Sequence, residues 1–207
     1  MQPFSIVSGP AAPLMRQDID TDVIIRIEHV NVPRAELGQW ALEPLRAPGF
    51  VLDQPMFRGA PILLTGANFG CGSSREHAVW ALQGLGIRCV IASSYGDIFF
   101  ANCFQNGMLP VTLPETAVVS LAEQAARGAN VTVDLRQCIV IAPDGTQHAF
   151  TLDPVRREML LEGVDELGLT LRSATQITAW QREDALRRPW AIPNSAGGGS
   201  VNTDPLM

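Results

Sequence analysis

Short apolar runs alternate with helical patterns through the middle of this chain, and this alternation is the feature that most constrains its fold. Three of the runs have the length and composition of buried strands: 61–65, 89–92 and 109–113. Helical patterns follow them over 74–85, 97–105 and 115–127. Strands that alternate with helices in this way predict a sheet with parallel pairs covered by helices.

After residue 129 the pattern changes to closely spaced strands. We expect strands at 131–135, 138–141 and about 148–152, the last two joined by a hairpin turn at Asp144 and Gly145. Two helices, near 154–163 and 174–187, then close the chain. The fold class predicted is α/β, with a mixed sheet that is parallel in the middle and has antiparallel additions.

One domain accounts for most of the chain. We expect it to cover residues 1–193, because a chain of 207 residues is long enough for one sizeable core and shows no internal repeat. Residues 194–207 are rich in glycine and lack a hydrophobic pattern, so we predict a flexible C-terminal tail there.

The charged residues restrict the chemistry, since all 15 basic side chains are arginine and none is lysine. A Walker-type phosphate loop and a Schiff-base enzyme both need a lysine, so these two classes are excluded. Arginine stays protonated and grips carboxylates with a planar fork, which makes a small anion the expected ligand. The net charge of −6 argues against nucleic acid as a partner.

Targeting and metal-binding patterns are missing from the sequence. We find no secretory signal and no apolar run that approaches the length of a membrane span, so we expect a soluble, cytoplasmic protein. The four cysteines, Cys71, Cys89, Cys103 and Cys138, are unevenly spaced and form no zinc-like pattern with histidine. We expect Cys89 and Cys138 to be buried in strands, and no metal site in this chain.

The segment Gly66–His77 is the strongest candidate for chemistry, because it follows a predicted strand and opens a predicted helix. Its glycines allow a tight turn and the close approach of a ligand. The free amides and positive dipole of the helix start favour an anion, and Arg75 adds a full charge. The alternative is architectural: Ser73 and Glu76 have the spacing of a capping box, and the glycines then only make a turn.

Two further segments carry polar clusters. In 18–22 three carboxylates surround Thr21, and they could hold a divalent cation, serve as turn and cap residues, or orient a basic group. We favour the last of these. In 94–107, Asp97 and Gly107 are expected to cap and end a helix, on which Asn102 and Asn106 share one face.

Taken together, segments 20–25, 68–77 and 97–107 resemble the small subunit of 3-isopropylmalate dehydratase, which is similar to the mobile swivel domain of aconitase. The likeness extends over roughly residues 5–185. It implies a single three-layer, swivel-type β/β/α domain with C-terminal helices.

The resemblance also implies half of an active site. In this family a large subunit carries a [4Fe-4S] cluster, and the pair isomerises 2-isopropylmalate and 3-isopropylmalate by dehydration and rehydration in leucine biosynthesis. By motif match, Ser73 is the proton acceptor and Ser74 and Arg75 bind a substrate carboxylate. Three further residues are expected to orient these side chains without contacting the substrate: Asp22, Glu76 and His77. Arg34, twelve residues after Asp22, is the candidate for a second substrate-binding arginine.

The sequence departs from the family in the loop that is thought to select the substrate's side group. Family members usually continue with Pro-Lys where this chain has Arg26 and Ile27, and the usual glycine- and aromatic-rich stretch is replaced by 34–38. A related alkylmalate, a methylmalate or a dimethylmalate, is therefore an alternative substrate. Two other classes stay open at this point: a stand-alone anion-binding module, and a purely structural assembly partner.

Overall fold

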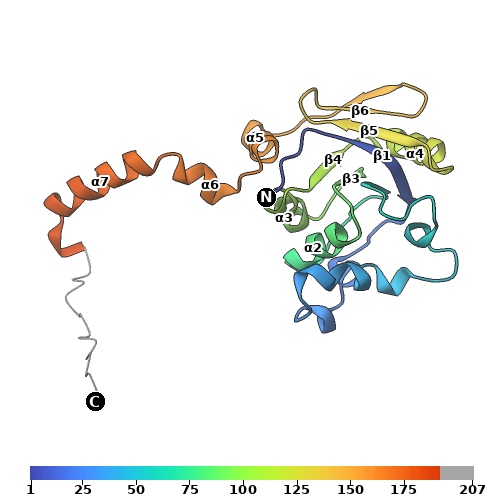
Figure 1. The fold of residues 1–207 in the computed structure, drawn as a ribbon, viewed down its shortest axis with the longest axis horizontal. Helices are drawn as coiled ribbons and strands as arrows, with labels where there is room; N and C mark the ends of the chain where they lie inside the picture. Colours follow the sequence, from blue (N-terminus) through green and yellow to red (C-terminus); the bar gives the residue numbers. More distant parts are fainter. Residues whose placement is uncertain (192–207) are drawn as a thin grey trace, which may run out of the picture. The chain divides into compact units, whose positions relative to one another are not determined.

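A mixed sheet of seven strands forms the centre of the computed structural model, which describes residues 1–191 (Figure 1). In spatial order the strands are β4 (Leu109–Thr112), β3 (Cys89–Ala92), β2 (Ile62–Thr65), β1 (Ile6–Leu14), β5 (Asn130–Asp134), β6 (Ile139–Ile141) and β7 (Gln147–Ala149). Strands β1 to β4 are parallel, and β5, β6 and β7 add antiparallel pairs on the other side of β1. The predicted α/β class with a mixed sheet is confirmed.

Strand β1 was missed by the sequence analysis, although it joins the two halves of the sheet. Its apolar pattern is interrupted by Pro10 and Pro13, and proline cannot donate to a strand ladder. The structure tolerates both because each half of β1 pairs along one edge only. Its first half, 6–10, pairs with β5, and its second half, 11–14, pairs with β2.

Five helices lie where the patterns predict them, with small shifts at their ends, whereas the one-turn helix at 21–24 was not predicted. Residues 1–166 form one compact unit that contains α1 (Thr21–Ile24), α2 (Glu76–Gly84), α3 (Asp97–Asn106), α4 (Glu115–Ala125) and α5 (Pro154–Glu162). Four short 3-10 helices between residues 27 and 53 were not predicted. They include η2 (Arg34–Trp40), which packs against α2.

A second compact unit runs from Leu167 onward. It contains α7 (Ala174–Arg187) and most of α6 (Glu166–Leu171), a helix that the sequence analysis did not predict. The expected single domain over 1–193 stays a prediction, and the expected tail at 194–207 lies outside the described residues. No helix within residues 1–191 is long and apolar enough to cross a membrane.

The predicted Asp97 cap was wrong, and the alternative in which Ser73 caps α2 is not observed either. Helix α2 has Arg75 at its N-cap position and α3 has Gly96 there, and neither helix start receives a side-chain cap bond. The hydroxyl of Ser73 and the carboxylate of Asp97 therefore do not cap these helices. The predicted helix end at Gly107 is confirmed, since this glycine adopts the left-handed conformation with φ +76°.

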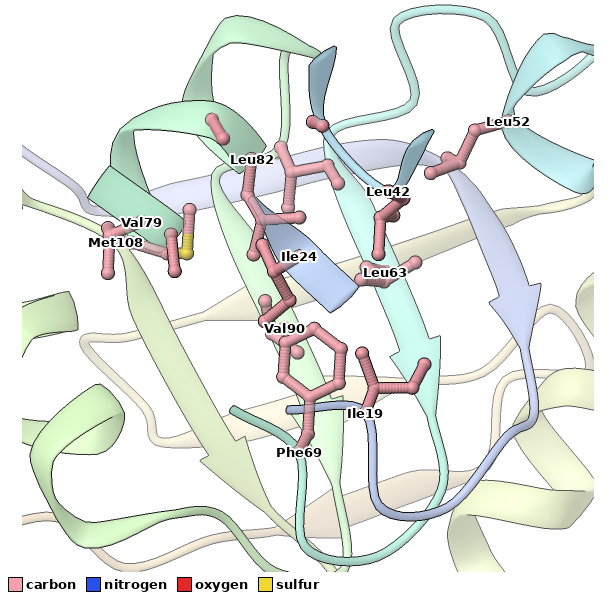
Figure 2. Packing of buried hydrophobic residues seen from close by; sticks show 14 of the residues in the cluster. Ile19, Ile24, Leu42, Leu52, Leu63, Phe69, Val79, Leu82, Val90 and Met108 are labelled. Carbon is pink, nitrogen blue, oxygen red and sulfur yellow. The ribbon is translucent and has the colours of Figure 1, made fainter. Parts of the chain in front are cut away.

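Apolar side chains fill both faces of the sheet because neighbouring strand residues point to opposite sides. On one face, Leu63 and Val90 pack with Ile24 of α1 and Leu82 of α2 (Figure 2). Helix α4 packs against β1 and β2 on the other face, as its residues belong to the second cluster. The parallel strands are thus covered on both sides, which fixes the loops at their ends.

Of the two cysteines predicted to be buried in strands, one is buried in a strand and the other is not. Cys89 is fully buried in β3, as expected. Cys138 is only partly buried and precedes β6 in a turn with φ +53°, so the expectation was wrong for this residue. The hairpin at Asp144 and Gly145 ends in a shorter strand than predicted, Gln147–Ala149.

The contact between η2 and α2 depends on two glycines and gives a stability prediction. A Cβ on the buried Gly38 would lie 2.4 Å from the backbone carbon and oxygen of Gly84. Because backbone atoms cannot swing aside, Gly38→Ala should lower the free energy of unfolding by about 2 kcal/mol. Chemical denaturation of the purified chain measures this, and an unchanged midpoint would contradict the close packing.

Candidate functional site

The loops that follow β1, β2 and β3 meet at the carboxyl ends of these parallel strands, the edge where open α/β sheets place their ligands. Backbone hydrogen bonds join the loops directly. Gly70 N–H donates to Ile19 O at 2.7 Å, and Thr21 N–H donates to Cys71 O at 2.9 Å. The β1 loop and the β2 loop therefore form one connected surface.

The glycines of the β2 loop are needed for this close contact. Gly70 has φ +72°, and a Cβ there would lie 2.2 Å from the ring of the buried Phe99. Gly96, in the β3 loop, approaches from the other side, where a Cβ would lie 2.5 Å from Gly70 O. No side chain larger than hydrogen fits at either position, so the loop that leads to Ser73 is held from both sides.

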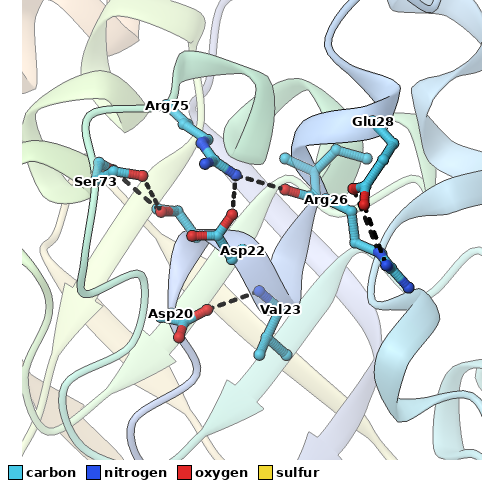
Figure 3. A network of polar contacts seen from close by, with 9 residues as sticks. Asp20, Asp22, Val23, Arg26, Glu28, Ser73 and Arg75 are labelled. Carbon is cyan, nitrogen blue, oxygen red and sulfur yellow. Dashed lines mark hydrogen bonds and ion pairs between the residues drawn. The ribbon is translucent and has the colours of Figure 1, made fainter.

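Ser73 is exposed, and its hydroxyl contacts the β1 loop instead of capping α2 (Figure 3). Its Oγ lies 3.1 Å from Thr21 Oγ1, and the Thr21 hydroxyl also lies 3.1 Å from Ser73 O as a donor. Thr21 is 1% exposed and therefore has a fixed position. The sequence analysis named Thr21 only as part of a carboxylate cluster and gave it no role.

Arg75 points toward α1, where it forms an ion pair with Asp22 (Figure 3). The guanidinium also donates to Ile25 O at 3.3 Å. The Arg75 side chain is 16% exposed and that of Asp22 is 58% exposed, so the pair lies at the surface of the site. Asp22 thus orients a basic group, which is the arrangement that we favoured for its cluster.

The other two carboxylates of the 18–22 cluster also have structural partners. Asp20 caps α1 by accepting a hydrogen bond from Val23 N–H at 2.7 Å, and Asp18 accepts one from the Asn68 amide at 2.8 Å. Among residues 1–191 there is no group of three histidine, cysteine or acidic side chains able to hold a metal ion. Metal binding by this cluster has no support in the described structure.

The start of α2 presents a series of unused backbone donors. In the described chain, no backbone N–H group from Gly72 to His77 donates to a protein acceptor. These groups lie at the positive end of the helix dipole, where negative charge is favoured. Together with Arg75 and the two exposed hydroxyls of Ser73 and Ser74, they form a site suited to a carboxylate.

Glu76 and Arg34 meet a different residue, the buried Asn106 at the end of α3. The Asn106 amide donates to Glu76 Oε1 at 2.7 Å, and its Oδ1 accepts from Trp80 Nε1 at 2.7 Å and from Arg34 Nη2 at 3.4 Å. Asn106 therefore joins α2, α3 and η2, a role that the sequence did not predict. Trp80 was missed, although it follows Glu76 by one helical turn.

The side chains of Arg34 and His77 contact Trp80 on α2 and form no hydrogen bond with the Ser73 loop in the described structure. The Arg34 guanidinium lies 4.8 Å from the Trp80 ring and donates to Gln83 at 3.0 Å, two turns along α2 from its start. The His77 ring packs on Trp80 at 4.7 Å between centroids. The substrate-binding role of Arg34 and the supporting role of His77 stay predictions.

The cysteines do not fit an iron–sulfur cluster. Cys71, Cys89, Cys103 and Cys138 come from separate segments, and within residues 1–191 none belongs to a group of three or more metal-binding side chains. Burial raises the pKa of the Cys89 and Cys103 thiols, which keeps them protonated. Burial and the carboxylates of Asp20 and Asp18 raise the pKa of Cys71 as well. This chain offers no thiolate set for a cluster.

Comparisons with known proteins show the family of this chain. Residues 1–116 match the family model for the aconitase C-terminal domain, and residues 120–154 match the model LeuD_N. A 3-isopropylmalate dehydratase small subunit from Cupriavidus necator is 48% identical over 203 residues, which covers 92% of this chain and 98% of the relative. The chain belongs to the 3-isopropylmalate dehydratase small-subunit family.

Other family members extend the likeness to the fold. The small subunit from Rhodospirillum centenum is 47% identical over 93% of this chain and 100% of its own length. A solved structure of 3-isopropylmalate dehydratase (leuD) from Methanocaldococcus jannaschii is 27% identical and superposes with a TM-score of 0.66, covering 84% of this chain and 99% of that one. The resemblance and the swivel-type fold expected from it are confirmed.

Proposed function

We propose that this chain is the small subunit of a cytoplasmic hydro-lyase that interconverts 2-isopropylmalate and 3-isopropylmalate in leucine biosynthesis. Family membership supports the reaction class. The observation that carries the proposal is the set of unpaired N–H groups from Gly72 to His77 beside Ser73 and Arg75. This is a preformed carboxylate site on a chain with no metal site among its described residues.

In this proposal a substrate carboxylate lies against the Arg75 guanidinium and the Ser74 hydroxyl. Arg75 is held by Asp22 and Ile25 O, so its fork is oriented before substrate arrives. Preorganised donors of this kind stabilise negative charge without a cost of reorganisation during the reaction. They also favour loss of the proton on the carbon next to the carboxylate, since charge that develops there spreads onto bound oxygens.

Ser73 accepts that proton through Oγ. A serine hydroxyl is a weak base, so its alkoxide form needs stabilisation by neighbouring donors. The helix start supplies positive potential, and the Thr21 hydroxyl lies in hydrogen-bond distance of Ser73 Oγ. Thr21 has one hydroxyl proton and two acceptors, Ser73 O and Ser73 Oγ. Turning that proton toward Oγ would stabilise the alkoxide.

The [4Fe-4S] cluster belongs to the large subunit in this proposal, because the cysteines of this chain do not fit it. The small subunit is then inactive alone and supplies the base and the carboxylate contacts. A related alkylmalate is the second candidate substrate. The observation that favours it is the departure at 26–38, where the chain folds into short 3-10 helices and the His29 and Trp40 rings stack at 4.2 Å.

Co-purification with a cluster-loaded large subunit, followed by assay on a panel of alkylmalates, tests the proposal. We expect a stable complex that turns over 3-isopropylmalate or a smaller alkylmalate, and no activity from either subunit alone. A complex without activity on any alkylmalate would favour a structural partner. Saturable binding of dicarboxylates without complex formation would favour a stand-alone module.

Thr21 gives a prediction that is specific to the arrangement around Ser73. Thr21→Val removes the hydroxyl but keeps the shape, so kcat of the complex should fall about tenfold with little change in KM. Thr21→Ser keeps the hydroxyl and should retain most of the activity. Equal rates for the two variants in a steady-state assay would show that the hydroxyl has no part in the reaction.

A further inference from the structure

A polar cleft of about 430 Å³ lies away from the Ser73 loop and has no assigned role. It is lined by Arg34, Gln83, Arg88, Gln105, Asn106, Gly107 and the first two residues of the chain. Its arginines come from distant segments, Arg34 from η2 and Arg88 from the residue before β3. No carboxylate belongs to this lining, although the whole chain carries a net charge of −6.

Both guanidinium groups are held in place by neutral partners. Arg34 lies over the Trp80 ring and donates to Gln83 and Asn106. Arg88 lies 5.6 Å from the Phe4 ring and donates to Gln2 and, at 3.1 Å, to Pro3 O. Within residues 1–191, neither arginine forms an ion pair with an acidic side chain. Each keeps N–H donors that none of these contacts uses.

Two positive charges in one cleft repel each other unless an anion lies between them. By contrast, Arg46, Arg75 and Arg26 of the same unit each have a carboxylate partner. The cleft also offers the Gln105 side chain, for which the described structure gives no hydrogen-bond partner, as a further polar contact. Its volume suits a small organic molecule better than a bare inorganic ion.

We propose that this cleft binds a small organic anion, whose carboxylate or phosphate oxygens are shared between Arg34 and Arg88. The cleft is distinct from the Ser73 loop because no residue of 66–75 lines it, and Gln83 is about 10 Å from the start of α2 at a rise of about 1.5 Å per residue. One lining residue, Asn106, also donates to Glu76 in the first turn of α2. The same assignment gives Arg34 a role other than binding substrate beside Arg75. It does not depend on the proposed function.

Isothermal titration of the full-length chain with L-malate and with glycerol 3-phosphate, at constant ionic strength, tests the cleft. We expect one anion to bind saturably in the Arg75→Gln background, where the Ser73 site is impaired. Arg34→Gln and Arg88→Gln should each weaken this binding at least tenfold. Arg127→Gln, which removes an exposed charge after α4, should leave it unchanged. Tighter binding of malate assigns a carboxylate, and tighter binding of the phosphate assigns a phosphate ester.

Two results would overturn the proposal. One is the absence of saturable binding for both anions, and the other is binding that Arg34→Gln leaves intact or that only Arg75→Gln removes. Because Arg88 also holds the N-terminal segment, Arg88→Gln could lower stability; thermal unfolding detects this, and Arg88→Lys, which keeps the charge, then replaces it. Arg34→Gln removes contacts with Trp80, Gln83 and Asn106, so its thermal unfolding is measured too, and Arg34→Lys replaces it if the variant is destabilised.

Discussion

Replacing Ser73 with alanine should reduce kcat of the assembled enzyme about a thousandfold while leaving assembly intact, the size of effect expected for loss of a general base. The Ser73 side chain makes no cap bond to α2, and the one hydrogen bond of its hydroxyl within the described residues is with Thr21. Its removal therefore costs little stability. The large change is expected in kcat, because the variant lacks the proposed proton acceptor.

Steady-state kinetics and subunit titration measure the two parts of this prediction separately. Ser120→Ala removes a partly buried hydroxyl on α4 that accepts a hydrogen bond from Gln124; it serves as the control and should keep full activity. If Ser73→Ala retained turnover within a factor of about three of the native rate, Ser73 would not be the base. A loss of assembly instead would place Ser73 in the subunit interface.

Replacing Arg75 with lysine should raise KM about a hundredfold with a smaller effect on kcat. An ammonium group still pairs with Asp22, so the local charge balance is kept. It lacks the planar fork that reaches Asp22, Ile25 O and a substrate carboxylate at once. The expected loss therefore concerns the geometry of the contact and not its charge.

Substrate-dependence curves for Arg75→Lys and for Arg127→Lys test this prediction. The control removes a guanidinium on an exposed turn and should leave KM unchanged. A KM for Arg75→Lys close to the native value would mean that Arg75 only neutralises Asp22. The carboxylate site would then consist of the backbone N–H groups of 72–77 alone.

The contiguous parts of the site could be predicted from the sequence, and its long-range contacts could not. The segment 66–77 carries its own turn, helix start and charge, so a candidate anion site could be predicted from one stretch. The contact between Thr21 and Ser73 joins residues 52 apart, and that between Arg34 and Asn106 joins residues 72 apart. Nothing in the local pattern specifies which distant side chain completes such a pair.

The errors in the fold have local physical causes. Ser73 and Glu76 have the spacing of a capping box. The β2 loop is hydrogen-bonded to the β1 loop, however, and this places the Ser73 hydroxyl beside Thr21 instead of at the start of α2. Strand β1 escaped prediction because two prolines break its pattern. The 3-10 helices between residues 27 and 53 are too short for a periodic signal. The parallel strands β2, β3 and β4 were found because each is a short apolar run.

Because its two halves pair with different strands, β1 affects the order in which the sheet forms during synthesis. Its second half gains its partner when β2 emerges from the ribosome, but Ile6 pairs with Asp134, which is synthesised much later. The parallel half of the sheet can therefore form while 6–10 is still an open edge. That edge is completed only after β5 has been synthesised, so the antiparallel half of the sheet is the last part to form.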